Sequence, residues 1–331
     1  AVCQSPYQAR AEYPVDFSEV RGQATAKRAL EIAAAGGHNL LMVGPPGSGK
    51  TMLARRLVSI LPPMTFEEAV ETTKVYSAIS ALPSDGALMS ERPFCAPHFT
   101  ISPVGLAGGG SGVPRPGQLS LAHNGVLFLD ELPEFPRRVL EIMRGPLEDK
   151  QITLSRKDVT VEYPSSIMLV AAMNPCPCGY AGSSRRCECA YLEIGRYQRR
   201  ISGPLLDRID LHTTVSAVHY AELTGETPEE PSATIRGRVE ASRAIQTARF
   251  AGFPVHCNAE MTPRHLHTFC HLGPGAERLI AHSVDVLGLS ARGYSRLLKV
   301  SRTIADLDGL GPITEEHVAE AIGFRRLTGQ G

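Results

Sequence analysis

The sequence predicts an α/β core built on a parallel sheet, followed by a smaller all-helical lid domain. Before about residue 225, short apolar runs typical of buried strands, as at 39–43, 126–129 and 167–171, alternate with helical patterns. The helical patterns after the last strand cover 233–250, 263–271, 274–288, 290–307 and 314–327. Alternating strands and helices indicate a parallel sheet covered by helices, and the purely helical continuation indicates a second domain.

Composition suggests where the domains meet. Residues 1–20 are expected to form an irregular N-terminal arm, 21–224 the α/β domain, and 233–331 the lid, with the acidic, proline-containing segment 225–232 as linker. Three segments of the α/β domain stand apart: a Gly/Pro-rich inserted loop at about 100–120, a hairpin at 151–166 and a Cys-rich loop at 175–190. The first residue is Ala rather than Met, which suggests a piece of a longer protein.

The bulk numbers are those of an ordinary globular protein, with 331 residues, 43% hydrophobic and 21% charged. No apolar run approaches the roughly 18 residues of a membrane span, and no basic-then-apolar leader opens the sequence. We therefore expect a cytoplasmic protein without a membrane partner. The 34 basic and 34 acidic side chains cancel, so any binding of nucleic acid has to use a local patch.

The segment GPPGSGKT has the glycine, lysine and threonine spacing of a phosphate-binding loop in every position. It lies between a short apolar strand and a helical pattern, where backbone N–H groups curl around phosphate oxygens. Lys50 is expected to reach the β and γ phosphates and the Thr51 hydroxyl to reach Mg²⁺. The nucleotide-contacting residues of this loop are Gly44, Pro45, Pro46, Gly47, Ser48, Gly49, Lys50 and Thr51.

A second apolar strand, VLFL, runs directly into Asp130 and Glu131. Its carboxyl end is the edge at which α/β proteins hold their ligands. Asp130 is expected to hold Mg²⁺, and Glu131 to orient or deprotonate the attacking water. A third strand ends at Asn174, a polar side chain placed to position water or to sense the γ-phosphate. Together these residues predict a P-loop ATPase that uses ATP and Mg²⁺.

Four cysteines form a C-x-C-x₈-C-x-C arrangement immediately after Asn174: Cys176, Cys178, Cys187 and Cys189. Two close pairs across a short loop suit a tetrahedral structural Zn²⁺, although C-x₂-C is the more usual spacing. Free, redox-sensitive thiols are the alternative. A second group lies at 265–271, where His267 and His271 would share one face of a helix. We interpret that group as ordinary lid residues, because no metalloprotease-type glutamate separates the histidines.

Blocks longer than a nucleotide motif carry a family resemblance, namely RGQATAKRALEIAAAGGHNLLMVGPPGSGKTMLARRL, HNGVLFLDELPEF, VAAMNPCPCGY, SGPLLDRIDLH and LSARGYSRLLKVSRTIADL. In this order they resemble the Mg-chelatase-related AAA+ ATPases, and among these the ComM (YifB-type) group. The resemblance covers about residues 16–327. It implies a P-loop AAA+ core with a helical lid. Members usually carry an N-terminal Lon-protease-like domain as well, which this sequence lacks.

The resemblance also implies a homo-hexameric ring with ATP between subunits. Arg208 then looks like the arginine finger that reaches the neighbouring γ-phosphate, a task suited to a permanently charged guanidinium. Arg292 looks like the lid arginine that senses nucleotide, and Gln23 corresponds to residues near the adenine.

The hairpin at 151–166 carries two adjacent cations near its tip, Arg156 and Lys157. In related helicases the equivalent hairpin enters the ring pore, where cations track phosphates without reading sequence. A solvated turn with ordinary charges is the alternative, and Arg156 has a rival role at the subunit interface in chelatase-type ATPases. The inserted loop, whose charge is Arg115, and the basic stretch 185–200 are further candidates for DNA contacts.

Three functions fit these residues. The first is a DNA helicase or branch-migration motor that acts in natural transformation and recombination. The second is a chelatase subunit that drives Mg²⁺ insertion into a porphyrin, and the third is a protein-remodelling ATPase. The hairpin cations and the ComM-type blocks favour the first.

Overall fold

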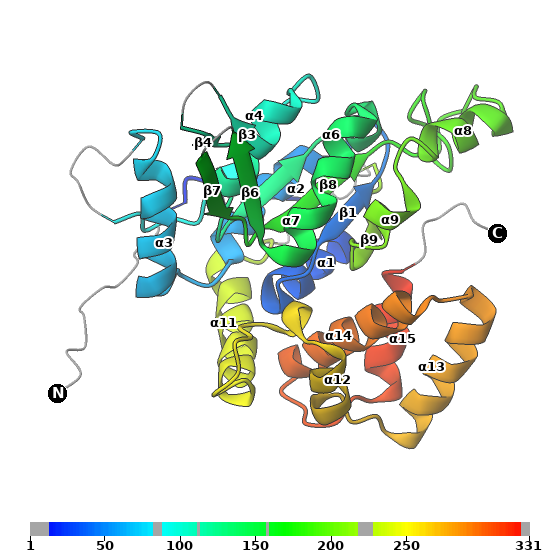
Figure 1. Ribbon diagram of the computed structural model, residues 1–331. Coiled ribbons are helices and arrows are strands. Elements are labelled where there is room, and N and C mark those ends of the chain that lie inside the picture. Colours follow the sequence, from blue (N-terminus) through cyan, green and yellow to red (C-terminus); the bar gives the residue numbers. More distant parts are fainter. Residues whose placement is uncertain (1–12, 82–87, 111–112, 157–158, 218–227, 326–331) are drawn as a thin grey trace.

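The computed structural model describes residues 13–81, 88–110, 113–156, 159–217 and 228–325. Figure 1 shows an α/β part above and a helical part below, in contact along one side. The central sheet has five parallel strands in the order β2-β5-β8-β1-β9. The strands are β1 (Leu40–Val43), β2 (Phe94–Cys95), β5 (Val126–Leu129), β8 (Met168–Met173) and β9 (Leu211–Thr214). This confirms the predicted α/β core.

The three central strands are buried on both faces, which explains why they read as continuous apolar runs. In β1, Leu40 and Met42 pack into one hydrophobic cluster, and Leu41 and Val43 pack into the other. The outer strands β2 and β9 were not predicted. β2 has only two residues and β9 reads LHTT, so neither carries an apolar run.

The longer predicted helices of the α/β part are present. Helix α1 (Ala24–Gly36) ends at Gly37, whose φ of 73° lies in the left-handed region that glycine tolerates. Helix α2 (Lys50–Arg56) continues as a 3₁₀ turn, η2 (Leu57–Ile60). The other helices are α3 (Phe66–Ser77), α4 (Pro103–Ala107), α5 (Gln118–Leu121), α6 (Arg137–Ile142), α7 (Arg144–Asp149), α8 (Tyr191–Gln198) and α9 (Gly203–Leu206), with 3₁₀ turns η1 (Phe17–Glu19) and η3 (Leu132–Glu134).

Two small hairpins lie together at one side of the α/β part (Figure 1). One is the predicted hairpin, formed by β6 (Gln151–Arg156) and β7 (Val159–Pro164). The other lies in the predicted loop region, where α4 is followed by β3 (Gly108–Gly109) and β4 (Arg115–Pro116). The Tyr163 hydroxyl donates to the Pro114 carbonyl at 2.8 Å, which ties the two hairpins to each other. The expected loop is therefore organised over much of its length.

The helical part confirms the predicted helical domain. It contains α11 (Ser232–Arg249), η4 (Asn258–Glu260), α12 (Pro263–Phe269), α13 (Pro274–Leu287), α14 (Ala291–Leu307) and α15 (Glu315–Gly323). Helix α12 ends two residues earlier than expected, and residues 326–327 lie outside the described ranges. No helix in those ranges combines the length and apolarity that crossing a membrane requires.

The two parts share one hydrophobic cluster, to which α1 contributes Leu30 and α14 contributes Leu297 and Ile304. Part of the predicted linker lies outside the described residues, but Glu229 pairs with Lys27 at 2.6 Å. At the start of α11, the Ser232 hydroxyl accepts the Phe17 N–H at 2.8 Å. These contacts fasten the lid to the α/β core.

The last residues of the predicted N-terminal arm are packed into the hydrophobic core, which the sequence did not indicate. Residues 1–12 lie outside the described ranges, but Phe17 and Val20 are fully buried in the shared cluster. Asp16 caps η1, its carboxylate accepting the N–H groups of Ser18 and Ser232 at 2.8 and 3.1 Å. The apolar residues of this segment are widely spaced and show no helical or strand periodicity. The sequence therefore could not predict their burial.

Replacing Phe17 with alanine is expected to lower the free energy of unfolding by about 3–5 kcal/mol, because it leaves a cavity where core and lid meet. Urea denaturation measures this loss. Phe66→Ala is the matched control, since Phe66 is 44% exposed and should cost less than about 1 kcal/mol. Equal losses for both variants would contradict a stabilising contribution from the buried Phe17 side chain.

Candidate functional site

The phosphate-binding loop connects β1 to α2, and its geometry requires glycine at several positions. Gly47 and Gly49 have φ values of 74° and 92°, which side-chain-bearing residues rarely adopt. At Gly44 a Cβ atom would lie 2.1 Å from the Val215 carbonyl oxygen. Helix α2 begins at Lys50, so its N-terminal N–H groups and partial positive charge face the loop.

The Lys50 ammonium group is buried inside the loop. Its Nζ donates to the carbonyls of Gly44 and Pro45 at 2.8 and 2.9 Å, and to Asn174 Oδ1 at 3.2 Å. Burial lowers the pKa of Lys50, and the nearby carboxylates of Asp130 and Glu131 oppose that shift. The predicted lysine, asparagine and acidic pair therefore meet in space.

The magnesium candidates also meet. Thr51 Oγ1 donates to Asp130 Oδ2 at 2.6 Å, although the two residues follow different strands. Glu131 has a φ of 53°, and its N–H donates to Asp130 Oδ1 at 3.0 Å. A left-handed backbone at a residue other than glycine costs of order 1 kcal/mol and is typical of functional sites. The turn leaves the Glu131 side chain exposed beside the loop. Thr51 and Asp130 present the oxygen ligands that Mg²⁺ prefers.

Asn174 follows β8, the strand between β1 and β5. The residues that hold its backbone come from α8 and were not predicted. Burial, with the nearby Glu134 carboxylate, raises the pKa of Tyr197 to about 12, while a hydrogen bond from the Asn174 backbone works against that shift. Gln198 Nε2 donates to the Pro175 carbonyl at 3.2 Å. Neither residue lies in a recognisable motif, so sequence reasoning had no signal for them.

Gln23 lies next to the phosphate-binding loop. It precedes α1 in a left-handed conformation with a φ of 59°. Its Nε2 donates to the carbonyls of Ser216 at 2.6 Å and Ser48 at 3.4 Å. Gln23 therefore joins the loop to the segment that follows β9.

The two candidate arginines lie together, with Glu148 of α7 between them. Arg208 is 7% exposed, and its guanidinium pairs with Glu148 at 2.8 Å and donates to the carbonyls of Arg144 and Pro204. Arg292 is exposed and lies 3.8 Å from the same Glu148 carboxylate. Among the described residues, neither arginine forms a hydrogen bond or ion pair with Lys50, Thr51, Asp130 or Glu131. Reaching a neighbour's phosphate would require Arg208 to leave Glu148.

Of the other predicted site residues, the cysteines form a cluster and the histidines do not. The four cysteines of the 175–190 loop converge, with all four Sγ atoms within 4.8 Å of one another. The histidine group does not converge: α12 ends at Phe269, so His271 is not on the same helix as His267. His265 packs against Phe253 and Phe269. Arg156 is exposed at the end of β6, whereas Lys157 lies outside the described residues.

Comparison with known proteins identifies the chain at the level of family. Residues 16–223 match the model of magnesium chelatase subunit ChlI, and residues 229–325 match the model of its C-terminal region. The chain belongs to the magnesium chelatase ChlI family. This is a family of AAA+ ATPases, which implies ATP and Mg²⁺ at the site described above.

Curated relatives agree with the family. The chain is 46% identical over 316 residues to competence protein ComM of Haemophilus influenzae, covering 95% of this chain and 60% of ComM. It is 45% identical over 314 residues to YifB of Escherichia coli, covering 94% and 60% of the two chains. A shorter stretch of 154 residues is 31% identical to Lon protease 2 of Bacillus subtilis, covering 43% and 26%. The chain thus spans about 60% of the length of ComM and YifB.

Glu131→Gln is expected to bind ATP but to lower the hydrolysis rate by about 10²–10⁴-fold, because an amide cannot accept a proton from the attacking water. Steady-state ATPase assays and fluorescent-nucleotide binding measure the two effects separately. Glu134→Gln is the control, an exposed glutamate three residues later that pairs with Arg200. ATP turnover by Glu131→Gln at the wild-type rate would refute the role of this carboxylate.

Proposed function

We propose that the chain is an ATP-hydrolysing AAA+ motor that works as a hexameric ring on DNA, as a helicase or branch-migration factor in natural transformation and recombination. The observation that carries the DNA assignment is the pair of joined hairpins, which present Arg115 and Arg156 next to the ATPase core.

In the hydrolysis step, Lys50 neutralises the β and γ phosphates, and Thr51 and Asp130 hold Mg²⁺. Glu131 accepts a proton from the attacking water, and Asn174 positions that water near the γ-phosphate. The contacts of Lys50 with Asn174 and of Thr51 with Asp130 support this assignment, because they place four of the five side chains around one loop. Glu131 directly follows Asp130 and hydrogen-bonds to it through its backbone N–H.

The positions of Arg208 and Arg292 support the proposed ring assembly. Both contact Glu148, Arg208 from a buried position and Arg292 from an exposed one, and in the described part of the chain neither forms a hydrogen bond or ion pair with the phosphate-binding loop of its own subunit. We infer that the face around Glu148 lies against the ATP of a neighbouring subunit. In the ring, the Arg208 guanidinium leaves the Glu148 carboxylate and binds the neighbour's γ-phosphate. Arg292 moves together with the lid.

DNA binding depends on local charge, since the chain carries no net charge. Arg115 of β4 and Arg156 of β6 are exposed on the two hairpins that Tyr163 joins. Cations placed this way bind phosphates without reading base sequence.

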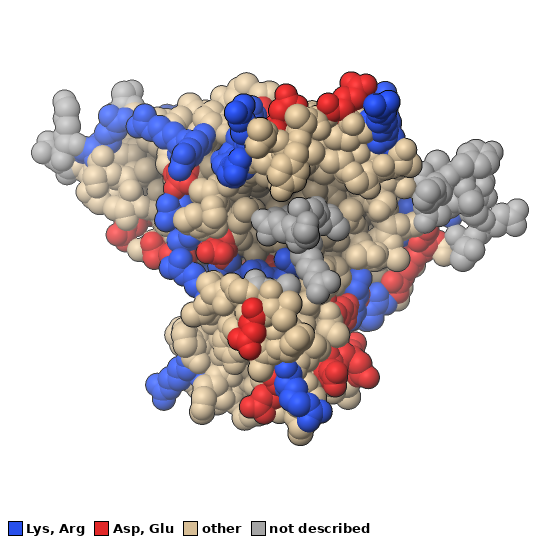
Figure 2. Space-filling model, turned by 90° about the vertical axis from the view of Figure 1, so that its right-hand side faces the viewer, with Lys and Arg blue, Asp and Glu red and all other residues tan. Residues whose placement is uncertain are grey.

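The face on the α8 side offers a second basic region. In Figure 2, which looks onto that face, basic side chains gather in groups over the upper, α/β part, with acidic ones between them. The basic stretch 185–200 belongs to this side. Two of its arginines already have partners, Arg185 on the Tyr180 ring and Arg200 on Glu134. We therefore assign the main contact to the hairpins.

The similarity to competence protein ComM supports a role in natural transformation. A protein-remodelling or chelatase-type ATPase would share the same ATP site without binding DNA. A DNA experiment therefore discriminates between these functions.

Forked and four-way-junction DNA are expected to stimulate the ATPase rate of the wild-type protein, with the effect falling steeply between about 50 and about 200 mM salt. Arg115→Ala and Arg156→Ala should weaken this stimulation while leaving the DNA-free ATPase rate unchanged. Arg264→Ala, an exposed arginine on α12, is the control. Absence of both DNA binding and stimulation at low salt would refute the motor and favour a remodelling role.

Arg208→Ala is expected to lower ATP turnover by about 10³–10⁵-fold, the usual contribution of an arginine finger. Mixing it with the equally inactive Lys50→Ala should restore part of the activity, because a ring then contains interfaces with an intact loop on one side and Arg208 on the other. Titrating one variant into the other and measuring phosphate release tests this. Failure of every mixture to recover activity in assembled rings would exclude a role in trans.

A further inference from the structure

We propose that Cys176, Cys178, Cys187 and Cys189 bind one structural Zn²⁺, and that this ion holds the Cys-rich loop against the phosphate-binding loop. The metal site stands on the cysteine geometry alone. Its consequence for nucleotide binding rests on the ATP site proposed above.

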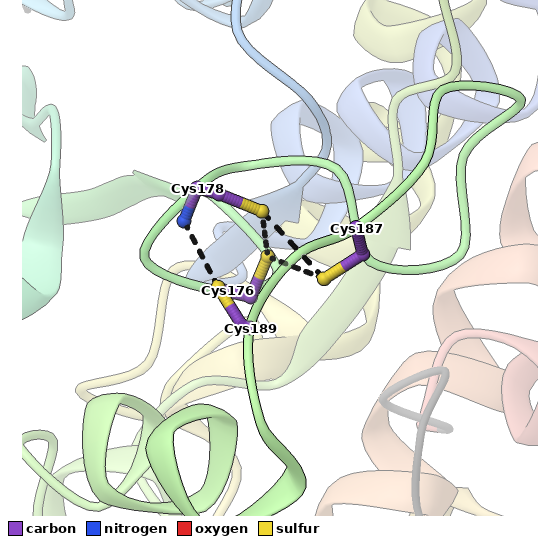
Figure 3. A group of neighbouring side chains, drawn as sticks. All are labelled: Cys176, Cys178, Cys187 and Cys189. Carbon is purple, nitrogen blue, oxygen red and sulfur yellow. Dashed lines mark hydrogen bonds between the residues drawn. The ribbon is translucent and has the colours of Figure 1, made fainter.

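The four thiols form a compact group with separations suited to one metal ion (Figure 3). Cys176 Sγ lies 3.4 Å from Cys178 Sγ and 3.7 Å from Cys187 Sγ, and the last two atoms are 3.6 Å apart. A tetrahedral ion with Zn–S bonds of about 2.3 Å separates its sulfur ligands by about 3.8 Å. The observed distances are close to that edge length.

Bonded disulfide sulfurs lie about 2.05 Å apart, so these separations exclude a disulfide within the triangle of Cys176, Cys178 and Cys187. All four cysteines are free, and the chain carries them in two pairs joined by eight residues. Four thiolates would complete a tetrahedral shell and leave no position for a substrate, which makes the site structural.

Two backbone N–H groups of the loop point at the sulfurs. The Cys178 N–H donates to Cys189 Sγ at 3.4 Å, and the Ala181 N–H donates to Cys176 Sγ at 3.3 Å. Hydrogen bonds of this kind orient metal ligands. The first of these bonds joins Cys189, the fourth proposed ligand, to the backbone of the first cysteine pair.

The cysteine loop touches the phosphate-binding loop through Gly179. This residue is buried, has a φ of 89°, and leaves so little room that a Cβ atom would lie 2.5 Å from Pro46 Cδ and 3.8 Å from Asn174 Cγ. It lies one residue after Cys178 and three after Cys176. An ion that fixes these two cysteines therefore also fixes the backbone that packs on Pro46.

The second attachment is at the start of the loop. Asn174 directly precedes it, and Gln198 and Tyr197 of α8 hold Pro175 and Asn174. Helix α8 begins two residues after Cys189, and its far end returns to the start of the loop through Tyr197 and Gln198. The ion would replace the hydrophobic core that this loop of small and polar residues lacks.

Metal analysis of protein purified under reducing conditions, without chelators, is expected to find about one zinc per chain. Mercurial titration of the thiols should release that zinc to a chromogenic chelator. Exchange with Co²⁺ should give the visible absorption of a tetrahedral tetrathiolate site. These readouts do not depend on ATP or DNA, so they remain valid if the proposed function is wrong.

Cys187→Ser should lose the zinc and the Co²⁺ spectrum, whereas Cys270→Ala, which removes a buried thiol of the lid, should keep both. If Cys187→Ser does not fold, the spectrum of Co²⁺-loaded wild-type protein decides the question. Equal metal content in wild type and folded Cys187→Ser, high or low, or a Co²⁺ spectrum without thiolate character, overturns the metal site.

Gly179→Ala tests the link to the nucleotide while leaving all four ligands in place. Its added methyl group should displace Pro46 and weaken binding of a fluorescent ATP analogue by about tenfold, or about 1.4 kcal/mol, with zinc retained. Gly182→Ala is the control, because Gly182 shares the positive φ but has nothing within 4 Å of its Cβ position. Equal nucleotide affinity for both variants would overturn the link and leave the zinc site standing.

Discussion

The structure depends on one geometric constraint: in a parallel sheet, the carboxyl ends of neighbouring strands meet at one edge. β8 lies between β1 and β5, so the phosphate-binding loop, Asn174 and the acidic pair end side by side. The resulting contacts, Lys50 with Asn174 and Thr51 with Asp130, join residues more than 70 positions apart in the chain. The same arrangement explains the three fully buried central strands, because the helices that connect parallel strands cover both faces of the sheet.

The lid and the arm extend this constraint to the rest of the chain. α1 packs on the sheet, and α11 and α14 pack on α1, so one hydrophobic cluster runs from β1 into the helical part. A movement of the lid would therefore be transmitted to the α/β core. Glu148 connects the same two parts electrostatically, because it contacts Arg208 of the core and Arg292 of the lid. In the ring proposed above, competition between this carboxylate and a neighbour's phosphate would couple nucleotide state to subunit arrangement.

Sequence reasoning worked where a physical requirement leaves a local trace. The glycines of the phosphate-binding loop, the apolar strands before Asp130 and Asn174, and the periodic lid helices each have such a trace. The family matches over 16–223 and 229–325 support the fold built from them. Sequence reasoning failed where burial depends on a few spaced residues. Phe17 in the arm, the four-residue strand β9 and Tyr197 of α8 have no pattern that distinguishes them from loop residues.

The sequence by itself determined the chemical groups, because phosphate and magnesium binding demand particular residue types at fixed spacing. It also showed four cysteines in two pairs, but left zinc and free thiols open. The tertiary structure decided which groups meet. It brought the four sulfurs within 4.8 Å of one another and packed Gly179 on Pro46, and it paired Arg208 with Glu148 instead of leaving it exposed. These relations depend on how distant segments pack, which residue spacing along one chain does not encode.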